Sequence, residues 1–254
     1  DKFCKDNPVD FLNKFSEEAV EPVLAEAYKQ FAEDSNAFTN RMVMGREVIA
    51  DRGIWTAKKR YILNVHDSEG VRYAQPKLKV MGIEAVKSST PMICRDAMKE
   101  MFKIIVQGDE KKTQDAIKTF KDSFKKLPPQ QIGFPRGVSS VSDYVDRNTI
   151  YRKGTPIHSR GSILYNYHVK KNGLDKKYQY ITNGDKIKFL YLKPGKFTQN
   201  VIAFPDFLPK EFNLEQHIDK ELQFQKTFTD AIEPILNAIG WTSVKVNSLE
   251  DFFG

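Results

Sequence analysis

The amino-acid sequence predicts an α+β chain: a small antiparallel sheet with a kinked helix, followed by a mainly α-helical part with one further β-hairpin. Apolar residues recur at helical spacing near both ends of the chain, and two β-rich runs flank an Asp-Ser-Glu-Gly turn. The 254 residues, 40% of them hydrophobic, suffice to bury a core. Because no apolar run approaches the length of a membrane span, the composition is typical of a soluble globular protein.

The first elements are a long helix and a hairpin. Asn7-Pro8 predicts a helix start, and Pro22 is expected to kink the helix. Extended structure is expected from Arg41 onward. The runs 58–65 and 71–80 around the turn 67–70 then predict a hairpin that ends at Gly82. The apolar residues of the helix, expected to be core, are Phe11, Phe15, Ala19, Leu24, Ala27, Tyr28 and Phe31.

Two helices are expected next. Ser88-Ser89-Thr90-Pro91 offers caps for a helix over 92–106, and a second helix over 110–127 carries its lysines mostly off the apolar stripe. The remaining expectations are an irregular stretch over 130–176, a hairpin of 177–182 with 186–192 around Asn183-Gly184-Asp185, and helical spacing near 214–236.

The positive charge is concentrated in the middle of the chain. The net charge is +7, but residues 52–196 alone carry 30 Lys/Arg against 13 Asp/Glu, or +17. Residues 1–51 (6 against 11) and 197–254 (4 against 9) are each at −5. Since phosphates attract Lys and Arg whatever the base sequence, this distribution favours a surface that binds a polyanion. The alternative is a solvated, lysine-rich face that only maintains solubility.

Cysteine and histidine usage indicates neither disulfides nor a metal site. Cys4 and Cys94 form no Cys-x-x-Cys motif, and the chain shows no hydrophobic signal segment at its start. These features favour a cytoplasmic location, the host-cell cytoplasm if the chain is viral. The four histidines are far apart in the sequence, which argues against structural zinc: His66, His158, His168 and His217.

The tetrapeptide Lys58-Lys59-Arg60-Tyr61 is the strongest local signal of nucleic-acid binding. If it opens a strand, Lys58 and Arg60 point to one face, and Lys59 and Tyr61 to the other. Such a ribbon suits a nucleic acid, with some cations on phosphates and another reaching base edges. A strand start defended against edge-to-edge aggregation is the alternative.

The segments 55–65, 67–84 and 87–91 closely resemble the late palm and the palm-to-thumb junction of family B DNA polymerases from bacteriophages of the T-even type. The resemblance extends backward through Val9-Asp10-Phe11-Leu12 and Glu21-Pro22. It extends forward, more weakly, through 156–161 and 164–166, and so covers essentially the whole chain. It implies a C-terminal remnant of the palm domain over 1–82, a thumb domain over 83–247 and a sliding-clamp-binding tail over 248–254.

The resemblance also implies site residues. Lys58 to Tyr61 would hold the primer–template duplex behind the active site, with Lys59 in the minor groove beside the primer end and Lys87 farther back. His158 and Arg160 match a thumb motif facing the primer backbone; a structural loop histidine with a surface arginine is the alternative. The implied DNA-binding residues are Lys58, Lys59, Arg60, Tyr61, Lys87, Ser88, Ser89, Thr90, His158 and Arg160.

The chain lacks the catalytic parts of such a polymerase. It has no Asp-Thr-Asp-Ser motif, so alone it is expected to be inactive and to bind no metal, Mg²⁺ belonging to the complete enzyme. Glu47 matches a position near the metal site, or is simply an ion-pair partner of an arginine. The chain is expected to be either the C-terminal polypeptide of a split polymerase or a fragment of a longer one. A palm remnant is then expected to expose apolar surface and to self-associate or depend on a partner.

The expected partners are primer–template duplex DNA, an N-terminal polypeptide with exonuclease, fingers and catalytic palm, and a sliding clamp; a membrane is not among them. Leu249, Phe252 and Phe253 fall within one helical turn and resemble a clamp-binding tail, although Val246 stands where the general pattern has Gln. A frayed terminus is the alternative. The competing function is a non-enzymatic duplex-binding or clamp-adaptor protein. Hydrolase, P-loop and dinucleotide-binding motifs are missing from the sequence.

Overall fold

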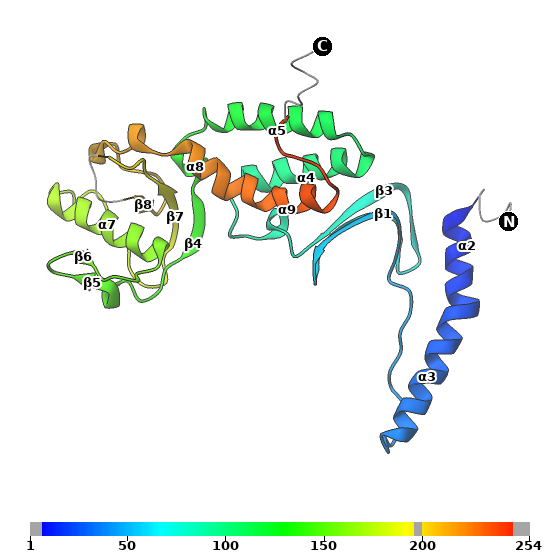
Figure 1. Cartoon of the computed structure of the whole chain (residues 1–254). Coiled ribbons are helices and arrows are strands. Elements are labelled where there is room, and N and C mark those ends of the chain that lie inside the picture. Colours follow the sequence, from blue (N-terminus) through cyan, green and yellow to red (C-terminus); the bar gives the residue numbers. More distant parts are fainter. Residues whose placement is uncertain (1–6, 196–199, 246–254) are drawn as a thin grey trace, which may run out of the picture. The chain divides into compact units, whose positions relative to one another are not determined.

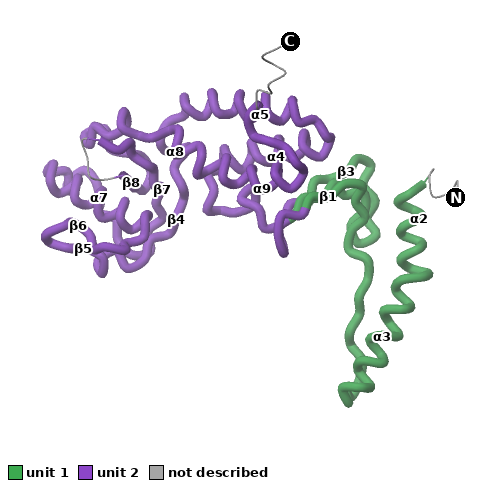
Figure 2. The backbone as a smooth tube through the Cα atoms, viewed as in Figure 1, with its two compact units in different colours: residues 1–54, 61–79 green, residues 55–60, 80–254 purple. Residues whose placement is uncertain are grey.

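The computed structural model describes residues 7–195 and 200–245 (Figure 1). It divides into two compact units, a first unit of residues 1–54 and 61–79 and a second unit of residues 55–60 and 80–254 (Figure 2). The α+β class with small antiparallel sheets is confirmed. Among the described helices, none combines the length and apolar character needed to cross a membrane.

The first unit begins with the expected helix. It runs through α2 (Pro8–Phe15), a π-helical turn (Ser16–Val20) and α3 (Glu21–Asp34). Pro22 has no N–H to bond to the preceding turn, and the interruption takes the form of this π-turn, in which the Glu21 N–H donates to the Ser16 carbonyl. Asn7 is the N-cap residue, but its side chain makes no capping hydrogen bond.

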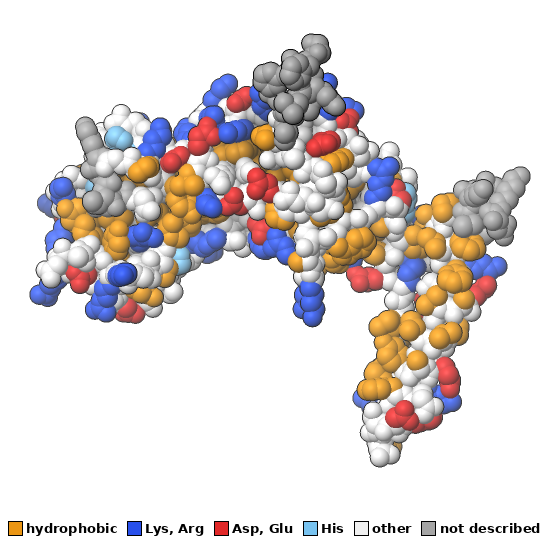
Figure 3. All heavy atoms as spheres, viewed as in Figure 1, with side chains coloured by type: hydrophobic (Ala, Val, Ile, Leu, Met, Phe, Trp, Pro, Cys, Tyr) orange, Lys and Arg blue, Asp and Glu red, His pale blue; other side chains and the backbone are white. Residues whose placement is uncertain are grey.

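The expectation that the apolar face of this helix forms core is wrong for this chain. Phe15, Val23 and Phe31 are 51%, 68% and 59% exposed, whereas Ala32 is the buried residue of α3. Hydrophobic side chains line the visible side of α2 and α3 (Figure 3). The spacing of the apolar residues is typical of a helix that packs on an apolar surface, but the described residues do not bury this apolar face.

A three-stranded sheet follows in the order β1 (Val48–Ala57), β2 (Arg60–Ser68) and β3 (Val71–Met81). The predicted hairpin of β2 with β3 is confirmed; Glu69 and Gly70 between the strands both have positive φ, as a tight hairpin turn requires. Lys58 does not start a strand, so the predicted alternation of Lys58 and Arg60 against Lys59 and Tyr61 is wrong. Lys58 and Lys59 form the turn between β1 and β2 because Lys59 adopts a left-handed backbone with φ 61°.

In the second unit, α4 (Met92–Gln107) and α5 (Glu110–Phe124) confirm the two helices predicted there. Gly108 is in a left-handed conformation and Asp109 caps α5 by accepting from the Lys112 N–H at 2.9 Å. The cap predicted for α4 is not made by a side chain, since Pro91 occupies the N-cap. Near the end of the chain, α8 (Lys220–Phe224), a π-turn (Gln225–Thr229) and α9 (Asp230–Ala238) supply the expected helical segment.

The prediction of irregular structure over 130–176 is wrong. This stretch contains α7 (Ile157–Lys171), which packs on β8 of an antiparallel sheet with the order β4 (Phe134–Gly137), β7 (Lys186–Tyr191) and β8 (Val201–Phe204). Helix and strand approach closely because Gly161 has no side chain; a Cβ there would lie 3.0 Å from the Ala203 nitrogen. The shorter elements are α6 (Pro129–Ile132), β5 (Val145–Asp146), β6 (Ile150–Tyr151) and 3₁₀ turns at Glu84–Val86, Ser142–Tyr144, Lys210–Phe212 and Glu215–His217.

The predicted hairpin of 177–182 with 186–192 is also wrong. Strand β7 pairs with β4 and β8 instead. The backbone of Ile181 bonds to a side chain of α7: its N–H donates to Asn166 Oδ1 at 2.7 Å, and its carbonyl accepts from Asn166 Nδ2 at 2.8 Å. One amide side chain thus takes the hydrogen bonds that a hairpin partner would have taken.

Candidate nucleic-acid interface

The basic turn Lys58–Lys59 is fixed by a glycine from the end of the sheet. Both lysine side chains are exposed. Gly82 has φ +68°, and a Cβ built on it would lie 2.2 Å from the Lys59 carbonyl oxygen. Any side chain at position 82 would therefore displace the backbone that presents Lys59.

Arg60 and Lys87 meet at a single carboxylate. Arg60 Nη1 and Nη2 donate to the two oxygens of Glu84 at 3.2 and 2.8 Å, and Lys87 Nζ donates to Oε1 at 2.8 Å. The Glu84 side chain is 27% exposed. Although its burial opposes ionisation, hydrogen bonds from Arg60 and Lys87 hold the pKa of Glu84 below its ordinary value. The group is an ionised triad with a net charge of one positive unit.

Ser88, Ser89 and Thr90 lead from this triad into α4, and they differ in exposure. Ser88 is exposed, whereas Thr90 is only 4% exposed. The Ser89 carbonyl accepts a hydrogen bond from Arg136 Nη1 at 2.7 Å, and the same nitrogen bonds to the Pro135 carbonyl at 2.9 Å. Burial lowers the pKa of Arg136, but a guanidinium remains charged in proteins.

Glu84, Lys87 and Arg136, together with Ser89 and Thr90, line one open cavity of about 400 Å³ in the second unit. Four of its polar members were missed by sequence reasoning: Glu84, Arg136, Tyr191 and Lys226. Lys226 ion-pairs with Asp230 at 2.8 Å, and it comes from the part of the chain whose net charge is negative. No spacing in the sequence links it to Lys87. The lining residues are Glu84, Lys87, Ser89, Thr90, Phe134, Arg136, Ile157, Phe189, Tyr191 and Lys226.

His158 and Arg160 both lie in α7 and not in a loop. Burial, and then the charge of Arg136, lowers the pKa of His158, so this imidazole is neutral at about pH 7 and supplies no charge there. Arg160 lies over the Tyr151 ring, 5.7 Å from its centroid, and donates to Asn200 Oδ1 at 3.3 Å. The charges of Arg136 and Arg160 both act on Tyr191, whose pKa is nevertheless raised because of its burial.

Glu47 and Tyr61 belong to the first unit. Tyr61 is half-buried. Glu47 accepts a hydrogen bond from Lys79 Nζ, which raises the pKa of Lys79, so its ion-pair partner is this lysine and not an arginine. The Mg²⁺ implied by the resemblance does not fit here, because Glu47 is already paired and no group of three potential ligands gathers anywhere in residues 7–195 and 200–245.

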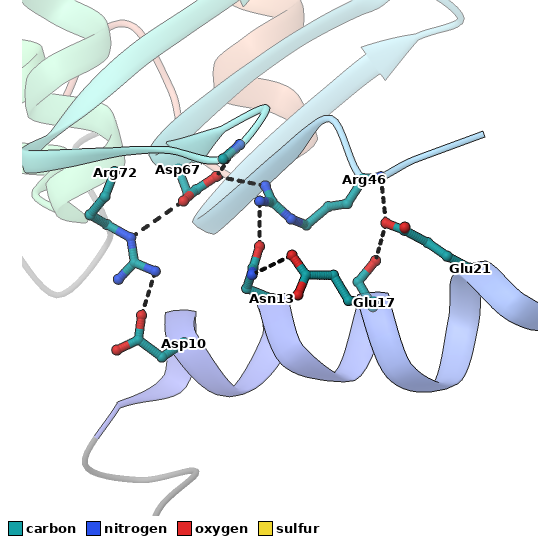
Figure 4. A network of polar contacts seen from close by, with 9 residues as sticks. Asp10, Asn13, Glu17, Glu21, Arg46, Asp67 and Arg72 are labelled. Atoms are coloured by element: carbon teal, nitrogen blue, oxygen red, sulfur yellow. Dashed lines mark hydrogen bonds and ion pairs between the residues drawn. The ribbon is translucent and has the colours of Figure 1, made fainter. Parts of the chain in front are cut away.

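A second polar cluster in the first unit joins helix and hairpin (Figure 4). Asp67, with a side chain 4% exposed, accepts from Arg46 Nη1 at 2.7 Å and from Arg72 Nε at 3.4 Å. Arg72 also reaches Asp10 of α2 at 2.6 Å. Although its burial opposes ionisation, hydrogen bonds from Arg46, Arg72 and the Gly70 N–H hold the pKa of Asp67 below its ordinary value. This cluster attaches α2 to the hairpin, so we assign it to structure.

Comparison with known proteins finds two phage polymerases. The chain is 32% identical over 268 residues to the DNA-directed DNA polymerase of Enterobacteria phage T4, covering 100% of this chain and 29% of the polymerase. It is 34% identical over 258 residues to that of Escherichia phage RB69, covering 96% and 28%. No family model matches. The chain therefore spans less than a third of the length of these relatives and is homologous to a portion of each.

Leu249, Phe252 and Phe253 lie outside the described residues.

Proposed function

We propose that this chain is the C-terminal portion of a family B DNA polymerase, late palm followed by thumb, that grips the primer–template duplex just behind an active site carried by another stretch of polypeptide. The observation that carries this proposal is the triad of Arg60, Glu84 and Lys87 beside a cavity that also contains Arg136 and Lys226. The homology to two DNA-directed DNA polymerases supports it.

The chemistry suits a sequence-independent grip on duplex DNA. Arg60, Lys87 and Arg136 are cations from separate segments of the second unit, and Arg136 is held rigidly by two backbone carbonyls. Cations of this kind bind phosphates of any sequence, and each phosphate contact releases condensed counter-ions. In the same proposal, the exposed turn Lys58–Lys59 reaches the minor groove, where acceptors are present on every base pair.

Duplex binding as a function of salt tests this role. Lys87→Ala and Arg136→Ala are each expected to weaken binding to every duplex alike and to flatten the slope of log K against log salt by about one unit. Lys103→Ala is the matched control, because Lys103 pairs with Glu100 on the exposed side of α4 and does not line the cavity. Duplex affinity that does not change with salt would contradict the proposal.

Catalysis is proposed to need an N-terminal polypeptide that carries the paired aspartates with their Mg²⁺, the fingers and the exonuclease. The apolar residues of α2 and α3 that stay exposed support such a partner. In a primer-extension assay, this chain mixed with the N-terminal polypeptide is expected to exceed that polypeptide alone. If it adds nothing, the chain is better explained as a duplex-binding or clamp-adaptor protein.

The tail over 248–254 is proposed to tether the polymerase to a sliding clamp through Leu249, Phe252 and Phe253. The support is the sequence alone: one aliphatic and two aromatic residues within one helical turn. A chain ending at residue 247 is expected to lose binding to the clamp while it keeps its affinity for duplex DNA. Equal clamp binding by both chains would exclude this role.

A further inference from the structure

Glu84 carries a negative charge at the point where the proposed interface needs positive ones. It accepts from both guanidinium ends of Arg60 and from Lys87, so a single carboxylate partly neutralises two cations that come from separate segments. The side chains of Arg60 and Lys87 are 31% and 42% exposed, which leaves both within reach of a ligand at the surface.

We propose that Glu84 is a positioning residue that competes with DNA phosphates for Arg60 and Lys87, and so sets both the strength and the salt dependence of the grip. This inference rests on the proposed function. Without DNA, the carboxylate orients the two cations and compensates their charge. When a phosphate approaches, one cation exchanges the carboxylate for the phosphate while the other stays paired.

Competition between Glu84 and the DNA phosphates suits a duplex that must move along the protein surface. A grip that binds every phosphate at full strength would slow each step along the duplex. When a phosphate leaves, the Glu84 carboxylate can pair again with the cation that held it. This lowers the free-energy cost of releasing the phosphate, because neither cation is left unpaired between two phosphates. The triad therefore favours an exchangeable contact over a tight one.

The charge count gives the size of the effect. With Glu84 ionised, Arg60 and Lys87 offer one net positive charge; without it they offer two. One further phosphate neutralised steepens the slope of log K against log salt by about 0.9 for duplex DNA. At about 0.1 M salt this corresponds to roughly eightfold tighter binding, and the gain vanishes as salt approaches about 1 M.

The test is equilibrium binding of the full chain to a short fluorescein-labelled duplex over a series of salt concentrations. Glu84→Gln keeps the size of the side chain and one acceptor oxygen but removes the charge, and it is expected to bind about eightfold tighter at about 0.1 M salt, with the steeper slope. Glu84→Ala is expected to show the same steepening with a smaller gain, because Arg60 loses its anchor. Glu100→Gln removes an equal charge from the Lys103 pair on α4 and is the control.

If Glu84 had only a structural role, its variants would not bind DNA more tightly than the unmodified chain. If Glu84→Gln and Glu84→Ala bind equally or more weakly with an unchanged slope, while Lys87→Ala weakens binding, the competition is refuted and the proposed grip stands. If Lys87→Ala and Arg136→Ala have no effect either, the proposed function fails with it. A double variant, Glu84→Gln with Lys87→Gln, restores the original charge and is expected to return the slope to that of the unmodified chain.

Discussion

Gly82 shows how a missing side chain sets the position of a basic turn. Gly82→Ala places a methyl group 2.2 Å from the Lys59 carbonyl oxygen at φ +68°, where an L-residue is already strained. We expect a loss of about 3 kcal/mol in the free energy of unfolding, measured by urea denaturation, from overpacking and left-handed strain together.

Gly70→Ala is the matched control for that prediction. Gly70 has φ +82°, but nothing lies within 4 Å of its missing Cβ, so only the backbone strain of about 1 kcal/mol remains. Gly82→Ala is also expected to weaken duplex binding at low salt. Equal stability losses at both positions would mean that the contact with Lys59 does not constrain the turn.

At the scale of elements, the attachment of α2 to the β2–β3 hairpin depends on Asp67. Removing its charge with Asp67→Asn leaves Arg46, whose side chain is 14% exposed, without its ion-pair partner, and among the described side-chain contacts only the hydrogen bond to Asn13 remains. We expect a cost of about 3 kcal/mol in the free energy of unfolding near neutral pH, as for other pairs broken on one side only. Asp34→Asn, at the exposed end of α3, is the control and is expected to cost little.

The same carboxylate predicts a pH dependence. Because the pKa of folded Asp67 is lowered, the unfolded chain binds more protons as the pH falls below the ordinary Asp value of about 3.9. The stabilisation is complete above that value and is lost as pH falls through the lowered folded pKa. Urea denaturation between neutral and acid pH is expected to show this loss in the unmodified chain and a smaller one in Asp67→Asn; parallel curves would contradict it.

Elements with a local chemical signature could be predicted from the sequence, and the others could not. The turn at 67–70 requires residues that tolerate positive φ, and the glycine at position 70 indicates such a turn in the sequence. Helix α7 gives no such signal because it is buried on several sides: Ser159, Gly161 and Ser162 are buried beside Leu164, so no apolar stripe alternates with a polar one. The failed hairpin had turn residues, but the Asn166 side chain took its hydrogen bonds.

For the whole molecule, the composition predicted a basic interface but did not predict which residues form it. The run of cations at 58–60 already singled out Arg60, and the resemblance to the polymerase family added Lys87. The cavity also contains Arg136 and Lys226, which only tertiary packing brings together. The position of the Glu84 carboxylate between the cations could not be predicted for the same reason. Arg60 and Glu84 are 24 residues apart, and an ion pair over that separation leaves no periodic pattern in a sequence.

The exposed apolar side chains of the first unit lead to a prediction for the chain as a whole. Val23 and Phe31 are 68% and 59% exposed, so replacing both with Gln is expected to change the free energy of unfolding by less than about 1 kcal/mol. If these side chains are a docking face, the double variant self-associates less in sedimentation experiments at rising concentration. It also stimulates primer extension by the N-terminal polypeptide less.

Lys29→Gln provides the control, since Lys29 is an exposed residue of α3 that pairs only with Glu26 at 3.7 Å among the described contacts. It is expected to leave both self-association and stimulation unchanged, because a surface pair of this kind contributes little. A double variant that sediments and stimulates like the unmodified chain would show that these apolar side chains are ordinary surface. An equal loss in Lys29→Gln would assign the effect to the charge of the helix and not to its apolar residues.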